Sequence, residues 1–463
     1  MKYLQNEDTI VALSTPFGKG AIAIVRLSGE KSLNIINKLF SKKITPKDHR
    51  RVFTGSLKSV KNGEFIDQVV VTYFHAPHSY TGEDVVEISC HGNPIIVDEI
   101  IEEVVVCGGR IARPGEFTER AFLNHKLDLA QAEAVANIIE SRTRQSLIYN
   151  MRQLEGKYSQ EIHRIKKRII DLLSLIEVSL DFNEGDIEIY EKEDAISRAR
   201  QINKAIQKLL KSYNYGRLLN EGIKIVLLGK PNVGKSSLMN ALLQKERAIV
   251  SEIPGTTRDY IEAQLEIEGM PVQVVDTAGI RHTTDPVEEL GVQRSLELIK
   301  HSDIVLALFE AHTDLSTDDF RLINLLSKNN SQTPVIIILN KVDLGKKVET
   351  FNSLKKLNYP IMWLSALKGD NLTELKNRIK ESLIEDTLLK DDEIILTNAR
   401  HRDALQKVYE NMKSFIRDIS EGVDEVVLAI ELRSALDFLG EITGEVTTED
   451  ILNHIFGKFC IGK

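Results

Sequence analysis

The sequence predicts a multidomain α/β protein with an N-terminal mixed α/β domain, a discontinuous helical domain and an inserted domain that has a mainly parallel sheet. Three observations support this fold class. Short β-rich runs fill the first 120 residues, long helical periodicity follows them, and short apolar runs alternate with helical ones between residues 222 and 384. At roughly 150 residues per domain, a chain of 463 residues also suggests two to four domains.

The N-terminal domain is expected over residues 1–120. Its strand candidates are AIAIVRL from Ala21, DQVVVTYF from Asp67 and DVVEISC from Asp84, and glycines and prolines between them mark turns. We therefore expect strands and helices to mix in this region.

The helical domain is expected over residues 121–221 plus 385–463. Apolar residues recur at three- and four-residue steps at Ile162, Ile165, Ile169, Leu172, Leu173, Ile176 and Leu180, as in the core stripe of a helix bundle. Helical patterns resume in ARHRDALQKVYENMKSFI and EVVLAIELRSALDFLGEIT, so we expect helices on both sides of the insertion to pack together.

The inserted domain is expected over residues 222–384. Its apolar runs IKIVLLG, VQVVDTAG, DIVLALFEA, PVIIILNKVD and IMWLSA alternate with helical patterns, which predicts a parallel sheet covered by helices.

Composition excludes several classes of protein. No run approaches the roughly 18 apolar residues of a membrane helix, and the N-terminus lacks a signal-peptide pattern, so we expect a cytoplasmic protein without membrane contact. The three cysteines lack metal-ligand spacing, which argues against a disulfide framework or structural zinc. A net charge of −8 disfavours indiscriminate nucleic-acid binding, and the basic residues between Arg164 and Arg168 are typical of a solvated helix face.

A phosphate-binding loop is predicted at GKPNVGKSS, from Gly229 to Ser237. It follows a strand, opens a helix and matches the pattern Gly-x4-Gly-Lys-Ser. Backbone N–H groups of such a loop cradle phosphates, Lys235 would neutralise phosphate oxygens, and Ser236 would ligate Mg²⁺.

Guanine recognition is predicted at NKVD, residues 340–343, directly after an apolar strand. The Asp343 carboxylate would accept hydrogen bonds from guanine N1–H and the exocyclic amine, whereas adenine offers no such pair of donors. Ser365, Ala366 and Leu367 follow the next strand and would close over the guanine oxygen. With DTAG at residues 276–279 and GTTRD at 255–259 in the expected order, these motifs predict GTP as substrate.

Further motifs narrow the match. They are DTIVALSTPFGKGAIAIVRLSG from Asp8, SYTGEDVVEISCHGNP from Ser79, RPGEFTERAFLNHKLDLAQAEA from Arg113, and the terminal FCIGK. Over essentially its whole length the chain resembles the TrmE (MnmE) family of tRNA-modifying GTPases, which belongs to the translation-factor-like GTPase class.

The resemblance implies how GTP is held and hydrolysed. Ile280 follows DTAG and has no polar atom to orient water, so the family's downstream glutamate is expected at Glu288, with Glu289 adjacent. It also implies K⁺ ligation by Asn232, Ser251, Ile253 and Thr256, with Mg²⁺ on Ser236 and Thr257. The expected GTP contacts are Asn232, Val233, Gly234, Lys235, Ser236, Ser237, Ser251, Thr256, Thr257, Asp276, Thr277, Ala278, Gly279, Asn340, Lys341, Asp343, Ser365, Ala366 and Leu367.

A second ligand is implied for the N-terminal domain, which in the family resembles tetrahydrofolate-binding domains. The matching contacts for 5-formyl- or methylene-tetrahydrofolate are Arg26, Glu87, Lys126 and Lys463. Cys460 is implied to be needed for tRNA modification, by direct chemistry or by shaping the folate site. The N-terminal domain is also the implied dimerisation domain.

The resemblance further implies a homodimer whose GTPase domains meet across the nucleotides and a flavoprotein partner, MnmG, in a heterotetrameric or larger complex. Together they would install a (carboxymethyl)aminomethyl group at carbon 5 of wobble uridine 34 in certain tRNAs. The chain itself has no Rossmann fingerprint for a redox dinucleotide. Two alternatives remain at this point: a ribosome-assembly GTPase and a regulatory GTPase switch without small-molecule chemistry.

Overall fold

The computed structural model describes residues 8–181, 191–244, 265–267, 269–276, 297–327, 333–384 and 394–463. The chain divides into two compact units. Unit 1 contains Met1–Ala136, Arg152–Arg198 and Ser414–Lys463, and unit 2 contains Asn137–Met151 and Ala199–Lys413. Helices α4, α5, α7 and α13 include residues of both units. The three-domain boundaries expected from the sequence stay a prediction.

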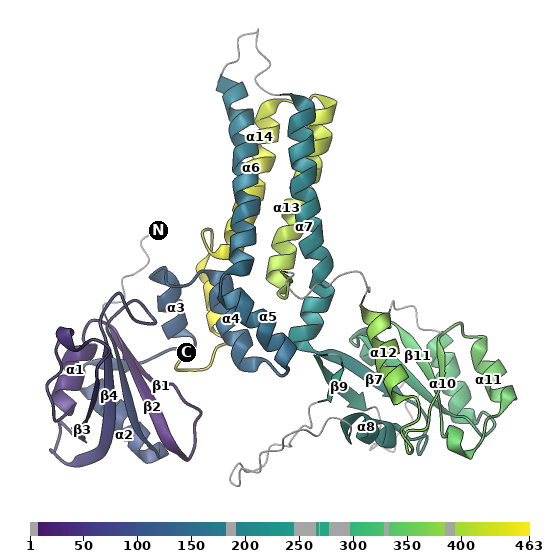
Figure 1. Cartoon of the computed structure of the whole chain (residues 1–463), viewed down its shortest axis with the longest axis horizontal. Helices are drawn as coiled ribbons and strands as arrows, with labels where there is room; N and C mark the ends of the chain where they lie inside the picture. The colour runs from purple at the N-terminus through teal and green to yellow at the C-terminus, as the bar shows by residue number, and fades with distance from the viewer. Residues whose placement is uncertain are drawn as a thin grey trace. The chain divides into compact units, whose positions relative to one another are not determined.

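Unit 1 contains a six-stranded sheet (Figure 1). Its strands are β1 (Thr9–Leu13), β2 (Gly20–Ser28), β3 (Val52–Lys58), β4 (Phe65–Phe74), β5 (Val85–Gly92) and β6 (Gly109–Ile111). They lie in the order β3-β4-β5-β2-β1-β6, and every pair is antiparallel except β1 with β6. The β-rich runs of the sequence therefore form one mixed α/β domain, as predicted.

Side-chain alternation gives this sheet two distinct faces. Val25 and Leu27 of β2 are buried in a core that also contains residues of α1 (Ser32–Leu39) and α2 (Pro94–Val106). Because neighbouring strand residues point to opposite faces, Arg26 lies on the other face of the sheet. There it is paired in register with Glu87 of β5.

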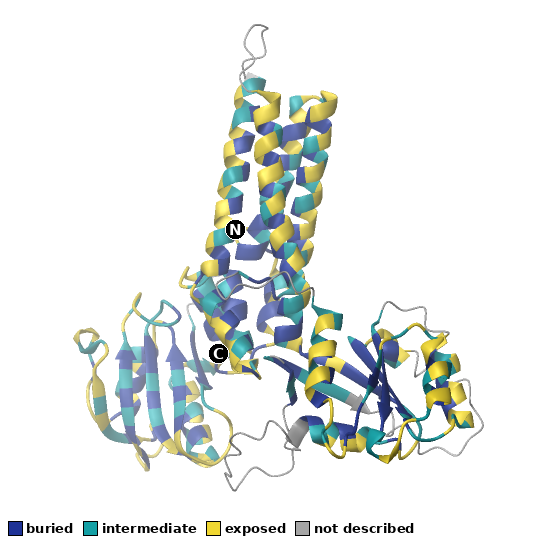
Figure 2. Cartoon of the chain, turned by 45° about the vertical axis from the view of Figure 1, so that its right-hand side comes forward, coloured by how far each residue is buried: buried dark blue, intermediate teal, exposed yellow. Residues whose placement is uncertain are grey.

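The remaining helical elements of unit 1 include α6, which carries the predicted apolar stripe. They are η1 (Pro46–Asp48), α3 (Glu116–Leu123), α6 (Lys157–Asp181), α14 (Glu425–Thr443) and α15 (Glu449–Phe456). All stripe positions of α6 are buried except Leu180, which is half-buried (Figure 2). Arg433 of α14 pairs with Glu177 of α6 at 2.7 Å. The stripe is thus a helix-packing surface that joins segments on both sides of the insertion.

Unit 2 contains a second six-stranded sheet. Its strands are β7 (Ile223–Leu228), β8 (Leu265–Ile267), β9 (Met270–Asp276), β10 (Ile304–Glu310), β11 (Val335–Asn340) and β12 (Ile361–Trp363). The order is β12-β11-β10-β7-β9-β8, and only β8 runs antiparallel to its neighbour. Ile225 and Val226, adjacent on β7, enter separate apolar cores on the two faces, as expected for a sheet covered on both sides.

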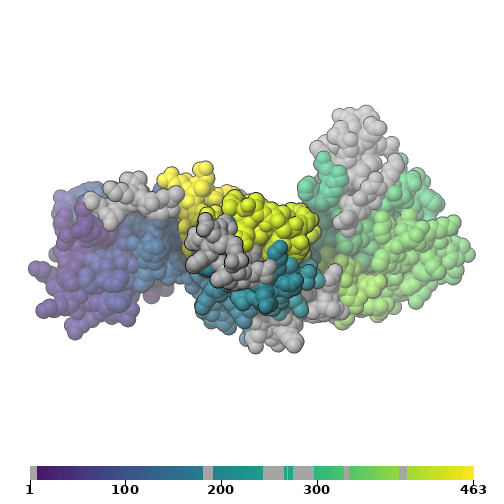
Figure 3. Space-filling model, turned by 90° about the horizontal axis from the view of Figure 1, so that it is seen from above, coloured from purple at the N-terminus to yellow at the C-terminus, as the bar shows by residue number. Residues whose placement is uncertain are grey.

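Helices on either side of this sheet complete unit 2. They include α8 (Lys235–Gln244), α10 (Thr317–Ser327), η3 (Val342–Leu344), α11 (Val348–Lys355) and α12 (Leu372–Leu383). Four further helices include residues of both units. In the sequence, α4 (Leu129–Glu140), α5 (Arg144–Leu154) and α7 (Lys192–Glu221) precede the sheet, and α13 (Ala399–Glu421) follows it. The described residues from 297 to 384, green in Figure 3, form one contiguous body.

A second helix pairing also bridges the insertion. The guanidinium of Arg402 on α13 lies 4.7 Å from the ring centroid of Tyr213 on α7, and Ser212 Oγ accepts a hydrogen bond from Leu396 N at 3.0 Å. The discontinuous helical pattern predicted from the sequence is therefore confirmed. Within the described ranges, no helix has the length and apolar character needed to cross a membrane.

Candidate active site

The phosphate-binding loop connects β7 to α8, as the motif requires. Asn232 has a φ of 58° and Gly234 a φ of 105°. A Cβ on Gly234 would lie 2.2 Å from Asn340 Nδ2, so only glycine admits this neighbour. Asn340 Nδ2 in turn donates to Val233 O at 2.8 Å. The loop therefore packs against a side chain from the predicted guanine motif.

The polar side chains of the loop are placed for phosphate and Mg²⁺. Ser236 and Ser237 are exposed on the first turn of α8, where backbone N–H groups lack partners within the helix. Lys235 Nζ donates to Gly229 O at 2.8 Å and to Lys230 O at 3.0 Å. The ammonium group is therefore held against the loop, and the donor set fits a polyphosphate with a hard divalent cation.

The guanine-reading residues meet beside this loop. Asn340 Oδ1 accepts from Ala366 N at 3.0 Å, and Ser365 Oγ donates to Asp343 Oδ1 at 2.6 Å. That hydrogen bond from Ser365 lowers the pKa of Asp343, which keeps the carboxylate an acceptor. Leu367 is exposed. The structure thus brings together the described residues of NKVD, the 365–367 turn and the phosphate-binding loop.

Several predicted site residues lie outside the described residues. They are Ser251, Ile253, Thr256, Thr257, Thr277, Ala278, Gly279, Ile280, Glu288 and Glu289. Asp276 ends β9, next in the sheet to β7, which places it at the same strand end as the phosphate-binding loop. The roles assigned to these residues stay predictions.

The predicted folate residues Arg26, Glu87 and Lys463 lie together in unit 1. Arg26 Nη2 and Glu87 Oε1 are 2.8 Å apart. Burial lowers the pKa of Lys463, and the nearby charge of Arg26 lowers it further while Glu87 opposes this. The three groups therefore form one charged cluster in which an acidic or carbonyl-bearing ligand would find cationic donors and an acceptor.

Two aromatic rings that the sequence reasoning missed border this cluster. The Arg26 guanidinium lies 5.6 Å from the ring centroid of Tyr80 and 5.8 Å from that of Phe117. Both residues occur within motifs that carry the family resemblance, and their place in these motifs could have identified them as candidates. Lys126 Nζ donates to Pro77 O at 2.9 Å, on the chain segment that leads to Tyr80.

The C-terminal tail reaches the cluster by docking on β1. Ser14 Oγ donates to Gly462 O at 3.2 Å, and a Cβ on Gly462 would lie 2.0 Å from Leu13 O. Lys463 N donates to Cys460 O at 3.3 Å, so a turn separates the charged residue from the exposed thiol. The tail is therefore an ordered part of this site, although its sequence position favours a loose end.

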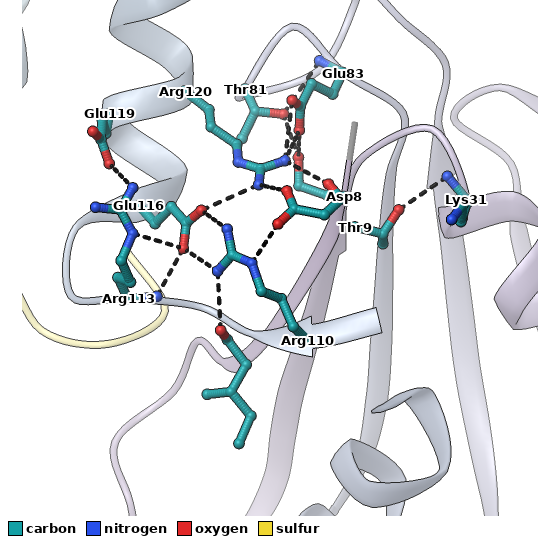
Figure 4. Close-up of polar contacts among 12 residues, drawn as sticks. Asp8, Thr9, Lys31, Thr81, Glu83, Arg110, Arg113, Glu116, Glu119 and Arg120 are labelled. Atoms are coloured by element: carbon teal, nitrogen blue, oxygen red, sulfur yellow. Dashed lines mark hydrogen bonds and ion pairs between the residues drawn. The ribbon is translucent and has the colours of Figure 1, made fainter. Parts of the chain in front are cut away.

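An ion-pair network in unit 1 surrounds the buried Glu116 and Arg120 (Figure 4). Glu116 is fully buried at the start of α3 and accepts from Arg110 Nη1 at 2.8 Å and Arg120 Nη2 at 3.1 Å. Arg120 also donates to Glu83 Oε2 at 3.0 Å and to Asp8 Oδ1 at 2.7 Å. The network joins β1, β6, α3 and the segment before β5, which no local sequence pattern indicated.

We expect Glu116→Gln to destabilise unit 1 by about 3 kcal/mol, because it removes a fully buried anion from between the buried Arg120 and the partly exposed Arg110. Burial raises the pKa of Glu116, but hydrogen bonds from Arg110 and Arg113 N outweigh it, so the pKa lies below the ordinary value of 4.5. The loss should thus be complete near neutral pH and shrink as the pH falls below about 4.5. Calorimetry of the full chain at several pH values measures it.

Glu119→Gln is the matched control on the same helix. Its carboxylate pairs with the exposed Arg113 at 2.9 Å, and its removal should cost under about 1 kcal/mol. Equal losses for the two variants would contradict a special role for the buried network.

Comparisons with known proteins agree with this geometry. The family description of the MnmE helical domain matches residues 129–460, and that of the GTP-binding protein TrmE N-terminus matches residues 9–126. The tRNA modification GTPase MnmE of Thermoanaerobacter sp. (strain X514) is 42% identical, over 98% of this chain and 99% of the relative. The proteins of the same name from Aquifex aeolicus and Moorella thermoacetica are each 43% identical over their full lengths.

Proposed function

The chain belongs to the MnmE family of tRNA modification GTPases, and we propose that it modifies carbon 5 of wobble uridine 34 in certain tRNAs together with the flavoprotein MnmG. It is a GTP-hydrolysing enzyme that takes part in tRNA modification. The product would be a (carboxymethyl)aminomethyl group. The observation that carries the proposal is the docking of the Cys460-bearing tail beside Arg26 and Glu87, in the same chain as a complete set of guanine-reading loops.

In this proposal the described loops bind and orient GTP. The amides at the start of α8 and the Lys235 ammonium hold the phosphates, while Asp343 and Ala366 recognise the base. Mg²⁺ held by Ser236 and Thr257, and K⁺ held by Asn232, Ser251, Ile253 and Thr256, would neutralise negative charge on the phosphates. Gly279 would sense the γ-phosphate through its N–H, and Thr277 and Ala278 would contact the nucleotide.

Hydrolysis then depends on a carboxylate and on dimerisation. Because Ile280 has no polar side-chain atom, Glu288 would orient the attacking water. Meeting of two GTPase domains in a homodimer would exclude water and complete the K⁺ site. GTP hydrolysis would drive a conformational change that is transmitted to the folate-bearing part of the protein.

Arg26, Glu87, Lys126 and Lys463 would hold tetrahydrofolate, which supplies the one-carbon unit when bound. The cluster fits such a ligand, since a pterin offers donors to Glu87 and a glutamate tail offers acceptors to cations. Redox equivalents would come from the flavoprotein. A cytoplasmic location, where tRNA and folate are available, belongs to the same proposal.

Nucleoside mass spectrometry of tRNA tests the function. Cells lacking this chain should lose the carbon-5 modification of uridine 34, and the intact chain should restore it. A Cys460→Ser chain should fail to restore it, whereas Cys107→Ser, at a half-buried thiol at the end of α2, should restore it. A tRNA nucleoside composition in the deleted strain that is unchanged from wild type would overturn the proposed tRNA function and leave the GTPase assignment intact.

A further inference from the structure

An ion-pair network lies between the phosphate-binding loop and NKVD in unit 2. Glu310, the last residue of β10, accepts from Lys230 of the loop at 2.9 Å. Its other carboxylate oxygen accepts from Lys341 of NKVD. Thr313 Oγ1 donates to Glu310 Oε2 at 3.4 Å. Glu310 therefore contacts both predicted nucleotide-binding segments at once.

We infer that Glu310 is a positioning residue that couples the phosphate-binding loop to the guanine-reading loop and so slows the release of guanine nucleotides. The inference rests on the proposed assignment of these two loops to the nucleotide. Glu310 itself would not touch the ligand. It would act through Lys230 on one side and Lys341 on the other.

The first step of the coupling runs through the phosphate-binding loop. Lys230 Nζ is held by Glu310 and also by Asp319 Oδ2, at 3.1 Å. Asp319 is buried and accepts from Ser316 N at 2.8 Å, which anchors it at the start of α10. The backbone carbonyl of Lys230 accepts from Lys235 Nζ. Fixing Lys230 therefore fixes the carbonyl against which the phosphate-binding lysine rests.

The second step runs through the guanine-reading loop. Lys341 has a φ of 64°, in the left-handed region that is unfavourable for a residue with a side chain. A fixed anion at Glu310 favours this conformation, because it holds the ammonium at the end of the side chain. The backbone of Lys341 directly precedes Val342 and Asp343. Its conformation thus affects where the base-reading carboxylate lies.

The charges in the network balance and are largely shielded from water. The side chains of Glu310 and Lys230 are 15% and 14% exposed, so their attraction is screened less than that of a surface pair. Burial raises the pKa of Glu310, but hydrogen bonds from Lys341 and Lys230 bring it down to about 2. The carboxylate is therefore charged near neutral pH.

Release of fluorescently labelled GDP from the full-length chain tests the inference. Glu310→Gln keeps the shape and removes the charge, and should speed GDP release about tenfold. Glu310→Asp keeps the charge on a shorter side chain and should give an intermediate rate. A double variant with Lys341→Met should release GDP more slowly than the product of the two single effects predicts, because both changes break the shared Glu310–Lys341 pair.

Asp303→Asn is the matched control. Asp303 precedes the same strand at its other end, is 12% exposed and pairs with Arg217 at 2.5 Å. It should lower the melting temperature while leaving GDP release within about twofold of wild type.

GDP release from Glu310→Gln within twofold of wild type, with a melting temperature lowered as in the control, would show a purely structural role and overturn the inference. Undiminished GDP binding by Lys235→Ala would instead overturn the assignment of the phosphate-binding loop, and the inference with it. The two failures are therefore distinguishable.

Discussion

The Asp343→Asn variant is expected to bind GTP about a thousandfold more weakly and to prefer xanthosine triphosphate. The carboxylate would accept two hydrogen bonds from guanine, and losing charged hydrogen bonds worth about 2 kcal/mol each gives this factor. Xanthine carries an oxygen where guanine carries the amine, so the asparagine amide would donate to it. Ser365 Oγ can still donate to the remaining carbonyl oxygen, which preserves the side-chain position.

Competition binding with GTP and xanthosine triphosphate measures which of the two nucleotides each variant prefers. Asp314→Asn is the control, because Asp314 is an exposed carboxylate of the same unit that pairs with Lys347 at 2.6 Å. It should keep the wild-type preference for GTP. If the Asp343→Asn chain still favoured GTP, the NKVD motif would not be the segment that recognises guanine.

The second large effect is expected for Glu288→Ala, whose turnover of GTP should fall by about two to three orders of magnitude. The reason is chemical, because no polar group stands at Ile280 to orient water and the downstream carboxylate would supply that role. GDP affinity should be unchanged, since this residue would act on water rather than on the nucleotide. Single-turnover hydrolysis and equilibrium binding separate the two quantities.

The adjacent carboxylate provides the comparison for this experiment. Glu289→Ala should retain most of the activity. Loss of turnover in Glu289→Ala alone would show that Glu289, and not Glu288, is the catalytic carboxylate.

The salt dependence of turnover tests the cation site. Wild-type turnover should be much faster in potassium than in sodium if Asn232 holds a cation. Equal wild-type rates in the two salts would contradict the cation site.

Local patterns in the sequence were sufficient for the secondary structure and for the nucleotide loops. The period of the α6 stripe predicted its buried face, and alternating strands and helices predicted the parallel sheet of unit 2. The sequence did not show the order of the parallel strands. The loops after their carboxyl ends nevertheless converge, because parallel strands of one sheet end at the same edge. Asn340 and Val233 do so at 2.8 Å.

Other parts of the site could not be read from such patterns. The Glu310 carboxylate is an ordinary strand-end residue in the sequence, and only the register of β10 with its neighbours places it between Lys230 and Lys341. The arginines around Glu116 likewise resemble solvated helix and strand residues. Their pairing depends on which elements pack together, and hydrophobic periodicity does not encode the partner of a charged group.

By itself, the sequence determined the class of chemistry. GKPNVGKSS, NKVD and the 365–367 turn are short segments that each follow a strand, so local sequence alone identifies them as nucleotide-binding motifs. Tertiary structure decided how the last residues of the chain pack against its first strands. Ser14 and Gly462 are 448 residues apart, and their contact exists only once the sheet, α3 and α15 have packed. Free-chain closure over such a length is entropically unfavourable, so the packed core of unit 1 is what holds the tail beside Arg26.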